Sequence, residues 1–123
     1  LIPYEDLRKL YKNCDAGIIA SLQEQCSYAA IEMLMHGMPV ISTMIDGLGE
    51  IFEDGKSGLK VNTVFSPVLG LSVDVRQMAR QISRLSSDGQ LRESLRKEGR
   101  LRYENVFTLQ KMMKDLVDLY NEM

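Results

Sequence analysis

The sequence has 123 residues, of which 45% are hydrophobic and 26% are charged. This size and balance fit one globular domain and exclude a disordered chain. The formal net charge of −2 argues against a nucleic-acid-binding protein, and no apolar run reaches the roughly 18 residues of a membrane-spanning helix. Cys14 and Cys26 are too few and too far apart for a metal-binding knuckle, so we expect reduced thiols and a cytoplasmic protein.

The first 62 residues alternate between helical and strand patterns. Short apolar runs are typical of strands buried on both faces, whereas apolar residues every three or four positions indicate helices. The β-α-β-α-β alternation predicts an α/β fold, a Rossmann-like domain whose parallel strands are joined by right-handed crossovers. The expected elements are a helix at 4–13, a strand at 16–20, a helix at 28–36, a strand at 39–43, a turn at 46–49, a short helix at 50–54 and a strand at 58–61.

The second half of the sequence predicts C-terminal helices. Apolar spacing predicts one helix from Val75 and another over 90–103, and Thr108 is expected to cap a last helix whose Met-rich stripe is interpreted as core. Residues 63–72 are expected to form an exposed connection. Because three strands make an incomplete doubly wound sheet, and because the sequence starts at Leu1 rather than Met, we expect the first strands to be missing from the N-terminal side.

Two loops follow predicted strands and mark the candidate site. In open α/β sheets, ligands bind beyond the carboxyl ends of the strands, and the loops at 21–27 and 44–49 leave such ends. Ser27 is a good N-cap for the helix that begins at Tyr28. The start of that helix offers free N–H groups and a partial positive charge, which suit a phosphate group.

Two glutamates in this region need an explanation. The helix at 28–36 is apolar around most of its circumference, and Glu32 is its only ionised group. A buried carboxylate without hydrogen-bond donors costs several kcal/mol, and ribose hydroxyls would supply two donors. Glu24 lies eight positions earlier, in the loop. Spacing alone equally allows Glu32 to face water and Glu24 to be an ordinary loop acid, and paired carboxylates are also found in glycoside hydrolases.

A resemblance to a known family favours the ligand-binding interpretation. The residues SLQEQCSYAAIE at 21–32, followed by HGMPVI at 36–41, resemble the signature of retaining GT-B glycosyltransferases of the family 4, or group 1, type. Its hallmark is two glutamates separated by seven residues, before a helix and a Gly-x-Pro-Val strand. The segments at 47–55 and 57–59 resemble further family motifs. The resemblance extends over the whole chain and is most specific at 20–59.

The resemblance implies a function and a set of site residues. Residues 1–123 would be part of the C-terminal, nucleotide-sugar-binding domain of a GT-B enzyme, whose N-terminal acceptor domain lies outside this sequence. The enzyme would transfer a sugar from a nucleoside diphosphate to a sugar or lipid-linked acceptor, with retention and without a metal or other cofactor. The resemblance implies that Glu24, in the catalytic site, contacts the donor sugar and that Glu32 contacts the ribose. It implies that the backbone at Cys26, Ser27 and Tyr28 contacts sugar or phosphate. Gly47 and Glu50 would also contact the donor.

The sequence departs from the family pattern at several positions, two of which bear on the candidate site. Ser27 stands where the family commonly has glycine, which adds a side chain beside the sugar, and Gly49 replaces a proline, which makes the second loop more mobile. The family's phosphate-binding Arg and Lys are expected before Leu1. Because the acceptor domain is also expected to be missing, we expect this chain to be inactive by itself. The alternative is a non-catalytic α/β module that binds nucleotides or other proteins.

Other residues have competing interpretations. The arginine stripe on the helix from Val75 is either solvated or a peripheral membrane contact, and the last helix can expose an apolar surface that forms a dimer. Polysaccharide biosynthesis is the expected pathway class by resemblance. The stripe consists of Arg76, Arg80 and Arg84. His36 is interpreted as a structural residue, and Asp46 as a turn former, with a substrate role as the alternative. Glu50 is either a donor contact or a first-turn helix residue.

Overall fold

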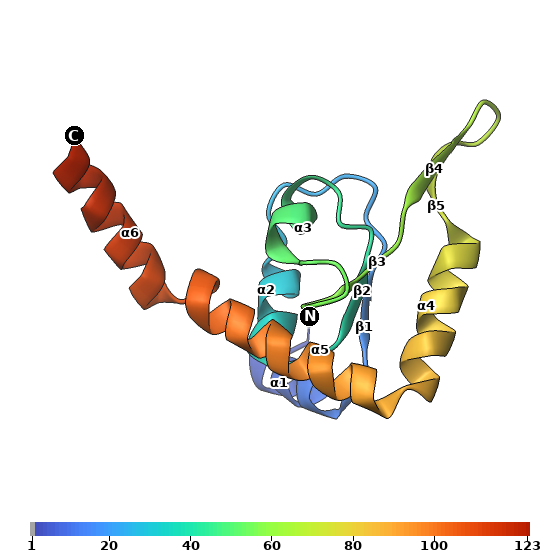
Figure 1. The fold of residues 1–123 in the computed structure, drawn as a ribbon, viewed down its shortest axis with the longest axis horizontal. Helices are drawn as coiled ribbons and strands as arrows, with labels where there is room; N and C mark the ends of the chain where they lie inside the picture. The colour runs from blue at the N-terminus through green and yellow to red at the C-terminus, as the bar shows by residue number, and fades with distance from the viewer. Residues whose placement is uncertain (1) are drawn as a thin grey trace.

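A computed structural model describes residues 2–123 and shows an α/β fold, in which helices flank a small parallel sheet (Figure 1). The sheet has the strand order β1-β2-β3, and both strand pairs are parallel, as predicted. The elements are α1 (Tyr4–Asn13), β1 (Gly17–Ile19), α2 (Tyr28–Met35), β2 (Val40–Ser42), α3 (Asp46–Ile51), β3 (Leu59–Lys60), β4 (Thr63–Ser66), β5 (Gly70–Val73), α4 (Val75–Ser87), α5 (Gly89–Arg102), the π-helical segment η1 (Tyr103–Phe107) and α6 (Leu109–Glu122).

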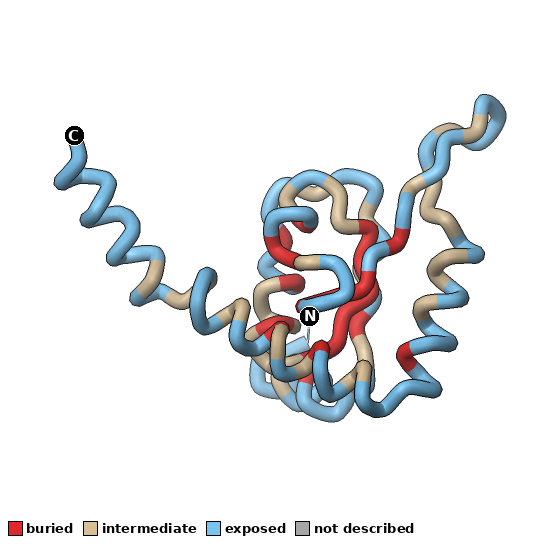
Figure 2. Tube along the Cα trace, in the orientation of Figure 1, coloured by how far each residue is buried: buried red, intermediate tan, exposed pale blue. Residues whose placement is uncertain are grey.

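The core lies on both faces of the central strand β2. Successive strand residues point to opposite faces, so Val40 packs with α2 and α3, whereas Ile41 packs toward α4 and α5. Leu34 of α2 and Leu85 of α4 are the buried partners on the two sides. Figure 2 shows buried residues concentrated in the sheet and in the helices that flank it. Two-sided burial holds at β2, but the prediction of it for the strand at 16–20 is wrong, because Ile18 of β1 is 50% exposed.

Helix ends follow the expected sequence signals. The Ser27 hydroxyl oxygen accepts a hydrogen bond from the Ala30 N–H at 3.3 Å and so caps α2. Thr108 caps α6 in the same way, through the N–H of Lys111 at 3.2 Å. Gly37 has a φ of +63°, a backbone conformation that favours glycine and that ends α2 where predicted.

The helix after β2 starts earlier than predicted. We expected a turn at 46–49 and a helix at 50–54, but α3 begins at Asp46 and ends at Ile51. Leu48 and Ile51, three positions apart, are both buried in the core beside α2. Burial of this pair draws the glycine-rich stretch into a helix despite its low helical propensity.

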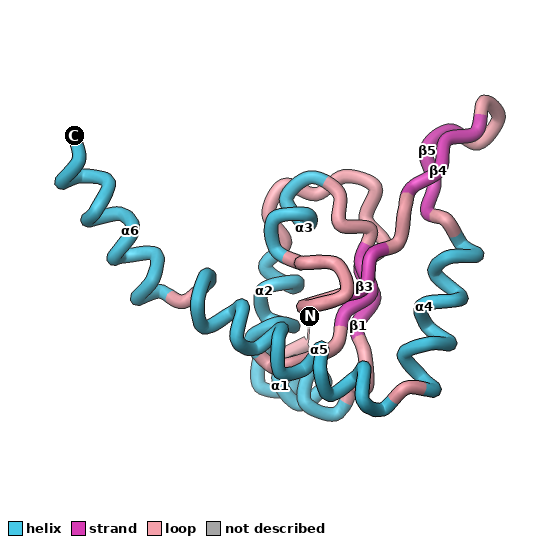
Figure 3. The backbone as a smooth tube through the Cα atoms, viewed as in Figure 1, coloured by secondary structure: helices cyan, strands magenta, loops and turns pink. Residues whose placement is uncertain are grey.

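The stretch at 63–72 is largely exposed, as expected, but the expectation of a connection without strands is wrong. It forms most of an antiparallel hairpin of β4 and β5, with Cα pairs from Thr63↔Val73 to Ser66↔Gly70 (Figure 3). β-branched, leucine and aromatic residues alternate on both sides of a short turn, and Gly70 has a φ of +72°. This hairpin signal is present in the sequence but was overlooked because no helix separates the hairpin from β3.

The last helix extends away from the sheet (Figures 1 and 2). Its apolar stripe was interpreted as core, but α6 has no buried residue among those described, so that interpretation is wrong and the stripe is an exposed apolar surface. Within residues 2–123, no helix is long and apolar enough to cross a membrane. The exposed residues of the stripe are Leu109, Met112, Met113, Leu116 and Tyr120.

Candidate functional site

The loops that follow β1 and β2 are joined to each other at the carboxyl edge of the sheet. The N–H of Thr43 donates to the Ile19 carbonyl at 3.1 Å, and the Thr43 hydroxyl donates to the Ser21 carbonyl at 2.6 Å. The N–H of Gly47, in the first turn of α3, donates to the Glu24 carbonyl at 3.0 Å. These bonds hold the loop that carries Glu24 against the start of α3.

Gly47 lies in closer contact with the first loop than any other residue type would permit. A Cβ at this position would lie 1.8 Å from the backbone oxygen of Gln25 and 3.3 Å from that of Glu24. Both neighbours are backbone atoms, so a side chain cannot be accommodated by a rotamer change. The structure therefore explains Gly47 as the residue that lets α3 pack on the Glu24 loop.

The loop after β2 holds two non-glycine residues in a left-handed conformation. Met44 has a φ of +47° and Asp46 a φ of +44°. Such a conformation costs roughly 1–2 kcal/mol for a residue with a Cβ, and strained residues of this kind cluster at functional sites. The buried Ser42 hydroxyl oxygen accepts from the Met44 N–H at 3.2 Å and supports the bend. Asp46, expected in a turn, is the first residue of α3.

The start of α2 faces the same edge of the sheet. Helices that follow parallel strands run back across the sheet, so their N-termini lie near the carboxyl ends of the strands. The N–H groups of the first turn have no acceptor within the helix, and one of them, that of Ala30, donates to the Ser27 hydroxyl oxygen. Ser27 is buried, whereas Cys26 and the Tyr28 side chain are exposed. The structure thus places these three predicted residues consecutively at one helix start.

Glu32 has a protein partner that the sequence analysis missed. The Tyr11 hydroxyl donates to Glu32 Oε2 at 3.1 Å, and the Tyr11 ring stacks on His36 with 5.5 Å between ring centroids. Burial, together with this hydrogen bond, raises the pKa of Tyr11 to about 12, so the hydroxyl remains a donor at neutral pH. Tyr11 therefore supplies one of the hydrogen-bond donors that the Glu32 carboxylate needs. A carboxylate accepts about four hydrogen bonds, so Glu32 keeps acceptor capacity for a ligand.

His36 is structural in this arrangement, as expected. Its ring lies against Tyr11, and among the described side chains its Nε2 is buried without a hydrogen-bond partner. Burial lowers the pKa of His36, and the charges of Arg8, Lys12 and Arg100 lower it further. The imidazole is therefore neutral at physiological pH.

Two arginines of α5 bind the C-terminal ends of α2 and α3, on the side away from the candidate site. Arg102 donates from Nε to the Ile51 carbonyl at 2.5 Å and from Nη2 to the Glu50 carbonyl at 2.6 Å, at the carboxyl end of α3. Arg100 donates to the Met35 carbonyl at the end of α2. Cations at helix C-termini are favourable, and these contacts fix both helices with their N-termini toward the candidate site.

Arg102 of α5 forms a long-range ion pair. Glu98 lies four residues before Arg102, a spacing that permits a local pair, but Arg102 pairs with Glu53 instead. Hydrogen bonding by Lys56, together with the charge of Arg102, lowers the pKa of Glu53. A pairing across about fifty residues has no local sequence signal, which is why it was missed.

The candidate edge is rich in acidic groups and poor in cations. Residues 13–55 contain seven Asp or Glu and no Lys or Arg. Lys60, at the end of β3, lines a cavity of about 400 Å³ together with Met44 and Ile45 of the strained loop. Negative charge on a ligand at this edge would therefore meet helix N–H groups and Lys60 rather than an arginine cluster.

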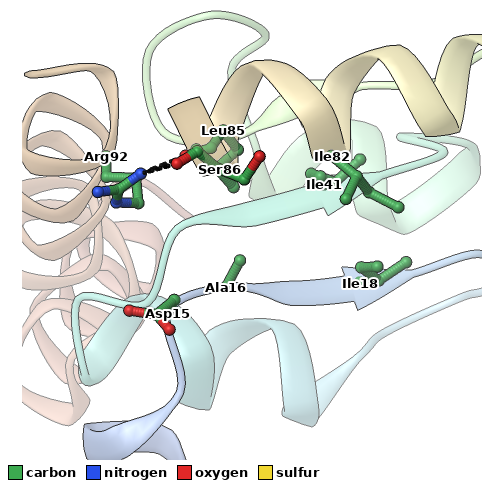
Figure 4. A pocket seen from close by; sticks show the side chains of 8 residues that line it. All are labelled: Asp15, Ala16, Ile18, Ile41, Ile82, Leu85, Ser86 and Arg92. Carbon is green, nitrogen blue, oxygen red and sulfur yellow. Dashed lines mark hydrogen bonds between the residues drawn. The ribbon is translucent and has the colours of Figure 1, made fainter. Parts of the chain in front are cut away.

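Another cavity lies away from this edge. A largely apolar hollow of about 320 Å³ lies between α4 and the strands β1 and β2. Figure 4 shows the side chains that line it. Its one arginine, Arg92, donates to the Leu85 and Ser86 carbonyls at 2.7 and 2.8 Å and so caps α4. Ile18 and Ile82, on its walls, are 50% and 41% exposed. We interpret the hollow as sheet surface that α4 covers only partly.

The structure does not join Glu50 to the two loops. Glu50 is exposed, one helical turn beyond Gly47, at the end of α3 that Arg102 caps. Within residues 2–123, no group of three His, Cys, Asp or Glu side chains could hold a metal ion. The ligand roles of Glu24, Glu32 and Glu50, and the independence from metals, stay predictions.

Comparison with known proteins identifies the family. The family model described as glycosyl transferases group 1 matches residues 2–102. The chain belongs to this family. A D-inositol 3-phosphate glycosyltransferase of Salinispora tropica is 30% identical over 118 residues, which are 96% of this chain and 22% of that protein. The chain therefore spans about a fifth of the length of that relative.

Solved structures share the fold of this group 1 domain. HepE of Anabaena, solved in complex with UDP-glucose, matches with a TM-score of 0.76 and 16% identity, over 94% of this chain and 29% of that one. The C-terminal domain of a group 1 glycosyl transferase, LpcC, of Francisella tularensis matches with a TM-score of 0.74 and 21% identity, over 89% and 51%. The predicted α/β fold and its GT-B resemblance are confirmed.

Proposed function

We propose that this group 1 glycosyltransferase domain binds a nucleoside-diphosphate sugar at the loops after β1 and β2. The observation that carries the proposal is the contact of Gly47 with the Glu24 loop, which joins both loops at the carboxyl edge of a parallel sheet. The family match supports it, as does the fold shared with a protein solved with UDP-glucose. The full-length protein would transfer the sugar to an acceptor hydroxyl with retention at the anomeric carbon.

Within this proposal, the two glutamates hold different parts of the donor. Glu24 contacts the sugar, at the reacting end of the ligand. Glu32 accepts from the ribose hydroxyls with the acceptor positions that Tyr11 leaves free. Both act as donor-binding groups rather than as the acid and nucleophile of a hydrolase.

The diphosphate is the group whose charge grows during transfer. Fixed N–H dipoles aimed at the leaving phosphate lower the barrier, and the N–H groups at Cys26, Ser27 and Tyr28 would supply them. Because residues 13–55 provide no cation, further neutralisation would come from Lys60 or from parts of the full-length protein outside these 123 residues.

Several finer assignments belong to the same proposal. Residues 1–123 would form part of a C-terminal donor-binding domain, in keeping with the match to the LpcC C-terminal domain. We also propose a sugar or lipid-linked acceptor, a role in polysaccharide synthesis and a cytoplasmic location. Membrane contact, and a dimer formed through α6, are further proposals. Ser27, in place of a glycine, would narrow the choice of donor sugar.

A non-catalytic binding module is the second candidate, and the absence of Lys and Arg from residues 13–55 favours it. A thermal-shift panel of UDP, GDP, ADP and their sugars, each at millimolar concentration and on full-length protein, separates the donor site from a module that binds only other proteins. We expect one nucleotide series to raise the Tm, because a ligand that binds only the folded state stabilises it. Glu32→Gln should reduce the rise in Tm with the nucleotide and with the corresponding nucleotide-sugar alike. Glu93→Gln, on α5, should leave both Tm shifts unchanged. No response to any nucleotide would favour the module.

A further inference from the structure

The hairpin of β4 and β5 exposes an uncharged, apolar tip. Residues 61–73 contain no charged side chain, although 26% of the whole sequence is charged. The side chains at the tip are highly exposed: Phe65 to 75%, Val68 to 89% and Leu69 to 81%. Figures 1 and 2 show the hairpin projecting from the body of the domain. An exposed apolar cluster of this kind marks an interaction surface.

The backbone of the hairpin satisfies its own hydrogen bonds. Four residue pairs join β4 and β5 from Thr63↔Val73 to Ser66↔Gly70. In the turn, the Ser66 hydroxyl oxygen accepts from the N–H groups of Val68 and Leu69 at 3.3 and 3.4 Å. An unpaired backbone group costs several kcal/mol in an apolar medium, so internal pairing lowers the cost of moving this tip out of water.

A cationic helix begins directly after the hairpin. α4 carries Arg76, Arg80 and Arg84, all exposed, and its residues 75–87 include no acid. The four-residue spacing places the three guanidinium groups along one side of the helix. An apolar tip followed by this positive stripe is complementary to an apolar layer with a negatively charged boundary.

We propose that the hairpin tip inserts into the interface of an anionic lipid membrane, with Arg76 and Arg80 attracted to the headgroups. Four strand residues span roughly 13 Å, and interfacial segments enter by about 5–10 Å. Arg76 then lies within about one Debye length of the surface, roughly 8 Å at physiological salt, and Arg84, two helical turns further along, lies beyond it. The arginine contributions therefore decrease from Arg76 to Arg84.

Membrane contact at this point would set the orientation of the domain. Two residues separate the carboxyl end of β3 from the start of the hairpin, at the same edge of the sheet as the loops after β1 and β2. Insertion of the tip would bring that edge toward the lipid surface. The proposal does not depend on donor binding, because neither the tip nor α4 contributes a residue to the proposed donor site.

Vesicle co-sedimentation of full-length protein tests the proposal. We expect binding to vesicles of phosphatidylcholine with 30 mol% phosphatidylglycerol, and much weaker binding to phosphatidylcholine alone. Leu69→Asp should reduce binding more than tenfold, because it places a charge at the inserted tip. Arg76→Gln should reduce it about fivefold at low salt, and Arg84→Gln much less. Leu69 is exposed, so an unchanged Tm should show that the Leu69→Asp protein is folded.

Two controls identify the segment that binds. Leu119→Asp places the same charge on the exposed face of α6 and should leave vesicle binding unchanged. Phe65→Trp adds a fluorophore to residues that otherwise contain no tryptophan, and its emission, after subtraction of the parent protein, should shift to the blue with anionic vesicles. No binding to either vesicle, loss of binding in Leu119→Asp, or an effect of Leu69→Asp on oligomeric state alone would overturn the proposal.

Discussion

The two halves of the molecule stabilise structure in different ways. Residues 13–55 form the sheet edge and its loops without any Lys or Arg, and backbone contacts such as Gly47 to Gln25 hold them together. The C-terminal helices supply arginines that cap α2, α3 and α4 from the opposite side. The comparison indicates that the candidate site depends on backbone geometry, while its support depends on long side chains that reach across the sequence.

The backbone contact at Gly47 should be the most sensitive point. Gly47→Ala would force a Cβ into the Gln25 carbonyl, so we expect a loss of about 3 kcal/mol in the free energy of unfolding, at the upper end of overpacking effects. Gly89→Ala is the matched control, because its Cβ would meet nothing closer than 3.6 Å. Urea unfolding of both variants measures the difference. Equal stability of the two variants would contradict the proposed packing.

The support from α5 should be the next most sensitive. Arg102→Gln removes hydrogen bonds to Ile51 and Glu50 and the ion pair with Glu53, in a side chain that is only 20% exposed. We expect a loss of about 2 kcal/mol, typical of hydrogen bonds to a charged group. Lys97→Gln, on the exposed face of α5, should change the free energy of unfolding by less than about 0.5 kcal/mol. A similar loss for both would show that α3 does not depend on Arg102.

The hydrogen bond from Tyr11 to Glu32 should have a moderate effect. Tyr11→Phe keeps the ring on His36 but removes the donor, which costs about 1 kcal/mol of stability. If Glu32 holds the ribose, nucleotide affinity should also fall severalfold, because the carboxylate loses a group that orients it. Tyr4→Phe, at a side chain that is 52% exposed, is the control for both measurements. Unchanged nucleotide affinity in Tyr11→Phe would show that this hydrogen bond does not support the ligand site.

The smallest effect should be a pH dependence from His36. Burial, with the charges of Arg8, Lys12 and Arg100, lowers its pKa below the ordinary value of 6.5. As the pH falls, the unfolded state therefore takes up a proton at His36 before the folded state does. The free energy of unfolding is unaffected by the protonation of His36 above about pH 6.5 and decreases as the pH falls toward the lowered pKa. His36→Gln should flatten the fall in Tm between pH 7.5 and 5.5. An identical pH profile in the variant would contradict the lowered pKa of His36 in the folded state.

The sequence was sufficient to predict the parallel sheet, because short apolar runs, Ser27 as an N-cap and Gly37 as a stop signal are local features. It failed where tertiary packing decides. Burial of Leu48 with Ile51 moved the start of α3 to Asp46, and no element within residues 2–123 covers the apolar side of α6.

The site shows the same division. Glu24 and Glu32 were predicted from a family pattern, and the N-cap position of Ser27 from local capping chemistry. The contact of Tyr11 with Glu32 and those of Arg102 with α3 join residues 21 and about 50 positions apart. Such contacts have no periodicity in a single sequence, so only the structure shows them.

The most direct test of the proposed donor site is a titration of full-length protein, wild type and Glu24→Gln, with the nucleoside diphosphate and the nucleotide-sugar selected by the thermal-shift panel. If Glu24 contacts the sugar, the variant should bind the diphosphate with unchanged Kd and the nucleotide-sugar at least tenfold more weakly. Equal Kd values for the nucleotide-sugar in wild type and variant would contradict the proposed role of Glu24.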